Sequence, residues 1–163
     1  MKFLGFASVL LALTAPAFGH WMLSNHQGAM DTAPLQAKKK EGGAFGLSLE
    51  CSADDVPIAR FSTPEKVGLA RAELMNAASI NLVVQVDENR HFVLAGKTDS
   101  AGDGQLSVTG EMPLDLLAQM GKAEQSVTSG LKILGAVYYT TAFSVDSARI
   151  AGRALARGCG ANF

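Results

Sequence analysis

Apolar and polar residues alternate along much of the chain, and this alternation predicts strands. Phe45, Leu47 and Leu49 are separated by small or polar residues, the pattern of a strand with one buried face. Residues 80–86 are almost wholly apolar and rich in β-branched side chains, as expected near the middle of a sheet. Similar patterns predict strands over residues 21–23, 56–61, 67–75, 91–95, 105–109 and 136–145.

Some of these segments carry further expectations. Pro57 lacks a backbone N–H, so the segment 56–61 is predicted at a sheet edge. Residues 67–75 fit a strand or a helix, and we favour a strand. The polar, glycine- and alanine-rich stretch 24–43 predicts a loop in which the lysines at 38–40 are solvated.

Two segments have helical periodicity. Pro113 suits the first turn of a helix over residues 112–121, with Leu114 and Leu117 on its apolar face and Gly121 at its end. A second helix follows a cap at Ser144 or Asp146 and ends near Gly158. Its arginines recur every fourth residue and predict a solvated face; they are Arg149, Arg153 and Arg157.

These elements together predict a mainly β fold of the α+β class. We expect an antiparallel β-sandwich or flattened barrel with one internal helix and a C-terminal helix. Residues 20–163 should form a single globular domain, since their number suits one hydrophobic core.

The first nineteen residues have the pattern of a secretory signal peptide. Lys2 precedes an apolar run that is too short to span a bilayer, and small residues then offer cleavage after Ala17 or after Gly19. No later apolar run approaches the roughly 18 residues of a membrane span. The protein is therefore predicted to be exported, to the periplasm or beyond.

Charge and cysteine content narrow the possible partners and the redox state. The chain has 14 Lys and Arg against 15 Asp and Glu, so nothing in its charge favours nucleic acid as a partner. Two cysteines in an exported chain predict one disulfide, between Cys51 and Cys159. Two free thiols or a shared metal are the alternatives, and no other Cys or His stands at ligand spacing near either residue.

The chain lacks the usual catalytic and nucleotide-binding motifs. Gly96-Lys97-Thr98 resembles part of a phosphate loop, but the residues before it are strand-like rather than glycine-rich. A hydrolase would need His91 beside a serine or an acid in a cleft. We therefore expect a protein that is not an enzyme.

One histidine suggests metal chemistry. Cleavage after Ala17 would make His20 the third residue, where the amine, two backbone amides and the imidazole can bind copper(II) or nickel(II) in a square plane. Cleavage after Gly19 would make His20 the first residue, with amine and imidazole as ligands, and His26 could add a further nitrogen. The simpler interpretation is that His20 only adjoins the processing site.

Several short motifs resemble those of small exported proteins of the invasion-associated locus B type. They are Trp21 soon after the signal, Leu47-Ser48-Leu49-Glu50-Cys51, Phe143-Ser144-Val145, Ala154-Leu155 and Cys159. The glycine that usually follows the Phe-Ser strand is replaced here by Asp146-Ser147. The resemblance implies a β-sandwich ending in an alanine-leucine helix and a closing cysteine, and no enzymatic activity.

The sequence therefore favours an exported, non-catalytic binding or accessory protein that acts on a protein partner in the cell envelope. A copper-binding protein that uses His20 is the alternative from a different class.

Overall fold

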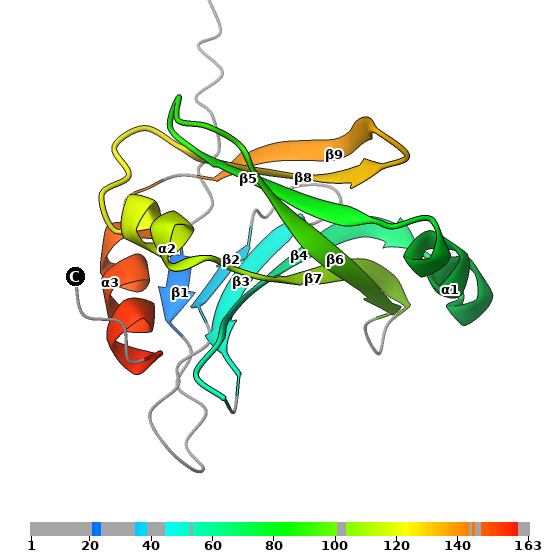
Figure 1. Cartoon of the computed structure of the whole chain (residues 1–163), viewed down its shortest axis with the longest axis horizontal. Coiled ribbons are helices and arrows are strands. Elements are labelled where there is room, and N and C mark those ends of the chain that lie inside the picture. The colour runs from blue at the N-terminus through cyan, green and yellow to red at the C-terminus, as the bar shows by residue number, and fades with distance from the viewer. Residues whose placement is uncertain are drawn as a thin grey trace, which may run out of the picture.

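A computed structural model describes residues 21–23, 35–38, 45–52, 54–100, 104–143, 145 and 148–159. These ranges contain nine strands and three helices (Figure 1). The elements are β1 (Trp21–Leu23), β2 (Leu35–Lys38), β3 (Gly46–Cys51), β4 (Pro57–Lys66), α1 (Leu69–Ala77), β5 (Asn81–Val86), β6 (Phe92–Ser100), β7 (Gln105–Glu111), α2 (Leu114–Met120), β8 (Val127–Ile133), β9 (Ala136–Phe143) and α3 (Ala148–Gly158).

All neighbouring strands run antiparallel, in the order β1-β2-β3-β4-β7-β6-β5-β8-β9. The sheet is strongly curled, so that β5, β8 and β9 form one layer over β3, β4 and β7 in the other (Figure 1). Strand β6 crosses diagonally between the layers, pairing with β5 over its first half and with β7 over its second. This architecture confirms the predicted mainly β, flattened-barrel fold.

The core lies between the two layers and is filled by the inward residues of each strand. Leu47 and Leu49 of β3 are fully buried, as their alternation predicted. Phe61 of β4 stacks on Phe45 at a ring distance of 5.8 Å and meets the edge of Phe143 from β9 at 6.4 Å. The aromatic contacts thus connect the first half of the chain to its last strand.

Helices close the two ends of the layered sheet. Helices α2 and α3 pack together at one end, and α1 lies at the other (Figure 1). Leu116, Leu117 and Met120 of α2 are buried. A Cβ atom on Gly152 of α3 would lie only 2.9 Å from the backbone nitrogen of Gly121, so the glycine permits the close approach of the two helices.

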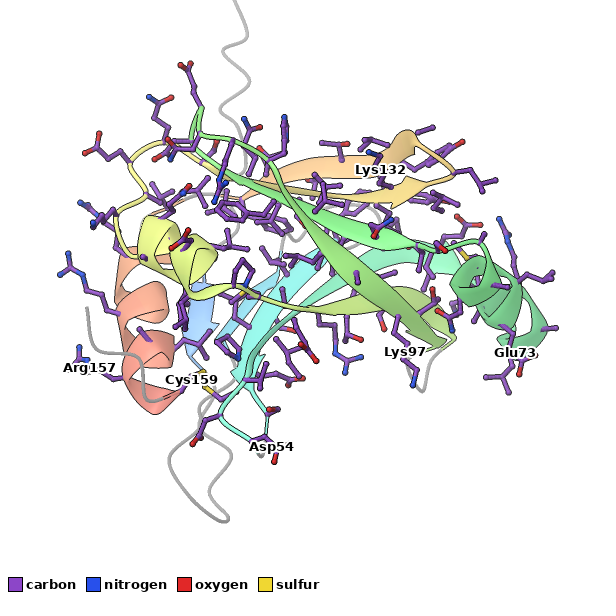
Figure 2. The ribbon with its side chains drawn as sticks, viewed as in Figure 1. Asp54, Glu73, Lys97, Lys132, Arg157 and Cys159 are labelled. Carbon is purple, nitrogen blue, oxygen red and sulfur yellow. A yellow bond between two sulfur atoms is a disulfide. The ribbon has the colours of Figure 1, made fainter. Side chains whose placement is uncertain are left out.

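A disulfide ties the C-terminal helix to the sheet, as predicted. Cys51 at the end of β3 is bonded to Cys159, 108 positions later, with their Cα atoms 5.6 Å apart. The sulfur–sulfur bond is seen beside the label of Cys159 in Figure 2. Because β3 lies between β2 and β4 in the sheet, the bond fixes α3 against the layer formed by β3, β4 and β7.

Helix α1 corrects the prediction of a strand over residues 67–75. Its sequence, Leu69–Ala77, consists mainly of Leu, Ala, Arg, Glu and Met, all strong helix formers, and has no β-branched residue. Ala72 is the one buried residue of this helix. Its weak amphipathicity explains why the periodicity alone did not identify it, and why the fold has two internal helices instead of one.

Three further expectations differ from the structure. Pro57 lies at the first position of β4, which is interior between β3 and β7; a first-position proline needs no ladder donor, and its carbonyl accepts a 2.8 Å bond from Met112 N. Strand β2 falls within the predicted loop 24–43. Leu117 is buried as predicted, but Leu114 is 50% exposed, because Leu116 and Met120 share the buried face of α2 with Leu117.

Strand β8 was not anticipated from the sequence. Its residues 128–130 are Thr, Ser and Gly, which hide the alternation of a strand. Ser129 is nevertheless buried, and its hydroxyl donates a 3.3 Å hydrogen bond to the carbonyl of Val83.

Within the described ranges, no helix has the length and apolar character needed to cross a membrane.

Candidate binding surface

A pair of glycines lies where β6 passes from one layer to the other. Gly96 of β6 is paired with Gly110 of β7, the last pair of that ladder. A Cβ atom on Gly96 would stand 2.7 Å from Val108 Cγ1 and 2.9 Å from the carbonyl oxygen of Ile80. A Cβ atom on Gly110 would stand 3.0 Å from Leu94 Cβ. Only residues without a side chain allow the two strands to cross this closely.

Beyond this crossing, β6 and β7 separate and leave a groove of about 680 Å³. Val93 projects into it and is 52% exposed. Lys97 and Glu111 are the charged residues of its lining. The groove is lined by Val56, Ile58, Phe92, Val93, Leu94, Ala95, Lys97, Thr109, Gly110, Glu111, Met112 and Pro113.

A second depression, of about 330 Å³, lies on the outer face of the layer formed by β5, β6, β8 and β9. Gly130 of β8 lies opposite Val83 of β5 and has no side chain to fill the space between its neighbours. A Cβ atom there would stand 3.1 Å from Thr140 Oγ1. The depression is lined by Val83, Gln85, His91, Val93, Thr128, Ser129, Gly130, Lys132, Val137 and Thr140.

Val93 belongs to both depressions, so they form one surface, which we call the Val93 surface. The described helices α1, α2 and α3 lie at the ends of the layers and leave this face of β5 and β8 open (Figure 1). Lys97 and Lys132, one from each depression, are well separated in Figure 2. The surface therefore combines the exposed Val93 with three charged residues, Lys97, Glu111 and Lys132.

The sequence carries one weak signal for this surface, in the strand β6. Residues 92–95 of β6 are all apolar and do not alternate with polar residues. In a strand, two of four such residues must face away from the core. Phe92 and Leu94 are buried, and Val93 and Ala95 are exposed.

The residues proposed for metal binding cannot be compared with the structure. His20 and His26 lie outside the described residues. Within the described part of the chain, no three His, Cys, Asp or Glu side chains cluster in a way that could hold a metal ion. His91 is exposed and lines the smaller depression, where no hydrogen bond joins it to a described serine or carboxylate.

Asp87 has a structural function near the end of α2. Its carboxylate accepts three backbone N–H groups, from Glu124 at 2.9 Å, Gln125 at 2.7 Å and Ser126 at 3.0 Å. Desolvation of the carboxylate acts to raise its pKa, but the three hydrogen bonds together outweigh it and lower the pKa below the usual range. Asp87 therefore holds the loop between α2 and β8 in place.

Comparison with solved structures supports the fold. No protein-family model matches the chain, and no curated protein matches its sequence. The fold is similar to the crystal structure of invasion associated protein B from Bartonella henselae, with a TM-score of 0.54 and 14% sequence identity. The match covers 86% of this chain and 94% of that one. The chain thus resembles the invasion-associated locus B type in its fold, as its short motifs predicted.

Proposed function

We propose that the protein is an exported, non-catalytic binding or accessory protein of the cell envelope. It holds an apolar segment of an envelope protein on the Val93 surface. The observation that carries this proposal is the groove left by the separation of β6 and β7, whose centre is an exposed valine instead of a set of polar groups. Exposed apolar depressions of this kind are typical of sites for protein or ligand binding.

The chemistry of the lining supports binding over catalysis. The larger groove contains Lys97 and Glu111 but no histidine, serine or cysteine. The smaller depression contains His91 and Ser129, but the Ser129 hydroxyl is engaged with the carbonyl of Val83. General acid–base catalysis needs a positioned donor and acceptor within hydrogen-bond reach of the reacting group.

Two features support the proposed location in the envelope. The first nineteen residues have the pattern of an export signal. The Cys51–Cys159 bond suits an oxidising compartment, since disulfides are rare in the reducing cytosol.

Photo-cross-linking in intact cells tests this function. A photoreactive amino acid at position 93 should give a specific adduct with an envelope protein, identified by mass spectrometry. The matched control carries the same group at position 74, because Leu74 is 70% exposed but lies on α1. The adduct at position 93 should fall severalfold when Val83→Glu places a charge in the adjoining depression.

Equal labelling from positions 93 and 74 would contradict the proposal. So would an adduct at position 93 that consists only of a second copy of this chain, or one that Val83→Glu leaves unchanged. Fractionation of the same cells tests the location independently, since the protein should be released with the envelope contents.

A further inference from the structure

Strand β9 is an exposed edge of the sheet. It is the last strand in the sheet order and pairs only with β8 among the described strands (Figure 1). Its eight residues, AVYYTTAF, include no charged residue and no proline. Charges and prolines are the usual means by which edge strands avoid pairing with other chains. The edge therefore lacks these two protections.

The hydrogen-bonding direction of each residue follows from the register. Ile133 and Ala136 close a two-residue turn and pair first, so the backbone groups of the next residue, Val137, point away from β8. At the other end, Asp87 N donates to Ser126 O, so Ser126 faces β5 and Val127 faces β9. Thr128 then faces β5 again, and its partner Ala142 points outward.

A bulge makes the spacing of these outward groups irregular. Ser129 pairs with Thr141, and Leu131 pairs with Tyr138. Gly130, the single residue between them on β8, therefore lies opposite two residues of β9, Tyr139 and Thr140. Tyr139 has a φ of 55°, in the left-handed region. Outward groups occur at every second residue of a regular strand, whereas Val137 and Ala142 are five positions apart. A regular strand cannot satisfy both positions.

We propose that β9 pairs with β9 of a second copy of this chain, antiparallel, about a two-fold axis between Tyr139 and Thr140. Val137 then lies opposite Ala142 of the second copy, and the same pair recurs on the other side of the axis. The irregular spacing is matched because symmetry gives both strands the same spacing.

The side chains of β9 suit this arrangement. Tyr138 would lie opposite Thr141 of the second copy, and neither pair brings like charges together. Val137 and Tyr138 are 53% and 49% exposed, so pairing would remove part of this apolar area from water. This proposal does not depend on the proposed function, since it rests on the outward backbone groups of β9, although Val137 and Thr140 also line the smaller depression of the Val93 surface.

Two double variants with the same number of new charges test the pairing. In Val137→Glu with Ala142→Glu, the symmetric dimer would place like charges opposite each other twice. In Val137→Lys with Ala142→Glu, it would place opposite charges together twice. Sedimentation velocity of the purified protein should show a dimer for the unmodified chain and for the Lys–Glu variant. The dissociation constant of the Glu–Glu variant should be on the order of tenfold higher than that of the Lys–Glu variant.

A difference in folding between the two variants would not explain a weaker dimer of the Glu–Glu variant, because it should favour the folded Glu–Glu chain. Val137 pairs with Lys132 of β8, so a glutamate at 137 should help each single chain fold, whereas a lysine there should not. Circular dichroism checks that both variants are folded. A chain that stays monomeric at all concentrations overturns the proposal. So does a dimer that the two variants form equally well, or an open series of larger assemblies, which would indicate head-to-tail pairing of different edges.

Discussion

The two ends of the layered sheet are closed by helices that are held in different ways. At one end, α2 contributes three buried side chains, and α3 is fixed by a disulfide and by the contact of Gly152 with Gly121. At the other end, α1 buries only Ala72. Arg157 on α3 and Glu73 on α1 mark these opposite ends in Figure 2.

Helix α1 is connected to the sheet by a polar contact. The side-chain amide of Asn76 donates to the carbonyl of Thr98 at 3.1 Å, and its oxygen accepts from Thr98 N at 2.6 Å. Strand β5 ends its pairing with β6 at Ala95, so the asparagine supplies β6 with hydrogen bonds where the neighbouring strand stops. The end at α2 and α3 is therefore stabilised by buried side chains and a disulfide. The end at α1 is held by two hydrogen bonds from one side chain, which replace those of a neighbouring strand.

Loss of the disulfide should lower the free energy of unfolding more than any other change at the two ends of the sheet. Cys51→Ser with Cys159→Ser opens a connection that spans 108 positions. The chain-entropy model gives about 4.7 kcal/mol for a loop of roughly this size, and measured losses run to about 2–5 kcal/mol. Urea unfolding would measure the loss. Because α1 buries only Ala72 and can open locally, hydrogen exchange should accelerate more in α3 than in α1; equal acceleration in both helices would mean that α3 does not depend on the disulfide more than α1 does.

Gly152→Ala should come next. The added Cβ would meet the backbone of Gly121 at 2.9 Å, and backbone cannot move aside cheaply, so a loss of about 1–3 kcal/mol is expected. Gly68→Ala is the matched control at the α1 end, where a Cβ atom would meet nothing within 4 Å. Its effect should stay within about 0.5 kcal/mol. A Gly152→Ala protein as stable as the Gly68→Ala protein would show that α2 and α3 can separate at little cost.

Asp87→Asn should give a smaller and pH-dependent loss. At neutral pH, the ionised carboxylate accepts three backbone N–H groups, and its replacement should cost about 1 kcal/mol. Because folding lowers the pKa of Asp87, its contribution is complete above the unfolded value of about 3.9 and is lost as the pH falls through the folded value. The stability curves of the two proteins should therefore converge below pH 4, and parallel curves would contradict this assignment.

Asn76→Ala should have an effect of about 1 kcal/mol or less on global stability, because both its hydrogen bonds are only partly buried. Its local effect should be larger: amide exchange at Thr98 and in α1 should accelerate severalfold while α3 remains protected. Asn81→Ala is the control, since among the described residues the Asn81 side chain donates its hydrogen bond to the nearby carbonyl of Ser79. Unchanged exchange at Thr98 would show that other contacts hold α1.

The elements that could be predicted from sequence are those whose composition and burial agree. Strand β5 is apolar and β-branched and lies between two other strands, so pattern and environment coincide. The sequence of α1 predicts a strand because two of its large apolar residues face solvent and obscure the helical periodicity; Leu69 and Leu74 are 71% and 70% exposed. Local sequence cannot reveal whether an apolar residue will be covered.

The candidate site was less accessible to prediction than the fold. The disulfide followed from two cysteines and an export signal, without any knowledge of geometry. The groove at Val93 depends on where β6 leaves β7 and joins β5, and this point is set by the pairing of Gly96 with Gly110 and of Asn81 with Ala95. The alternation of residues within β6 and β7 does not reveal where the two strands separate, and Val56 and Ile58 join the lining from another part of the chain.

The crossing at Gly96 also has a consequence for how the molecule unfolds. The first residues of β6 pair with β5 in one layer and its last residues pair with β7 in the other, and the strand is continuous between them. If either layer opens, β6 loses its pairing partner in that layer. The other layer is then weakened as well, because β6 is also one of its strands. The two halves of the sheet should melt together as one cooperative unit, even though their faces and their helices are so unequal.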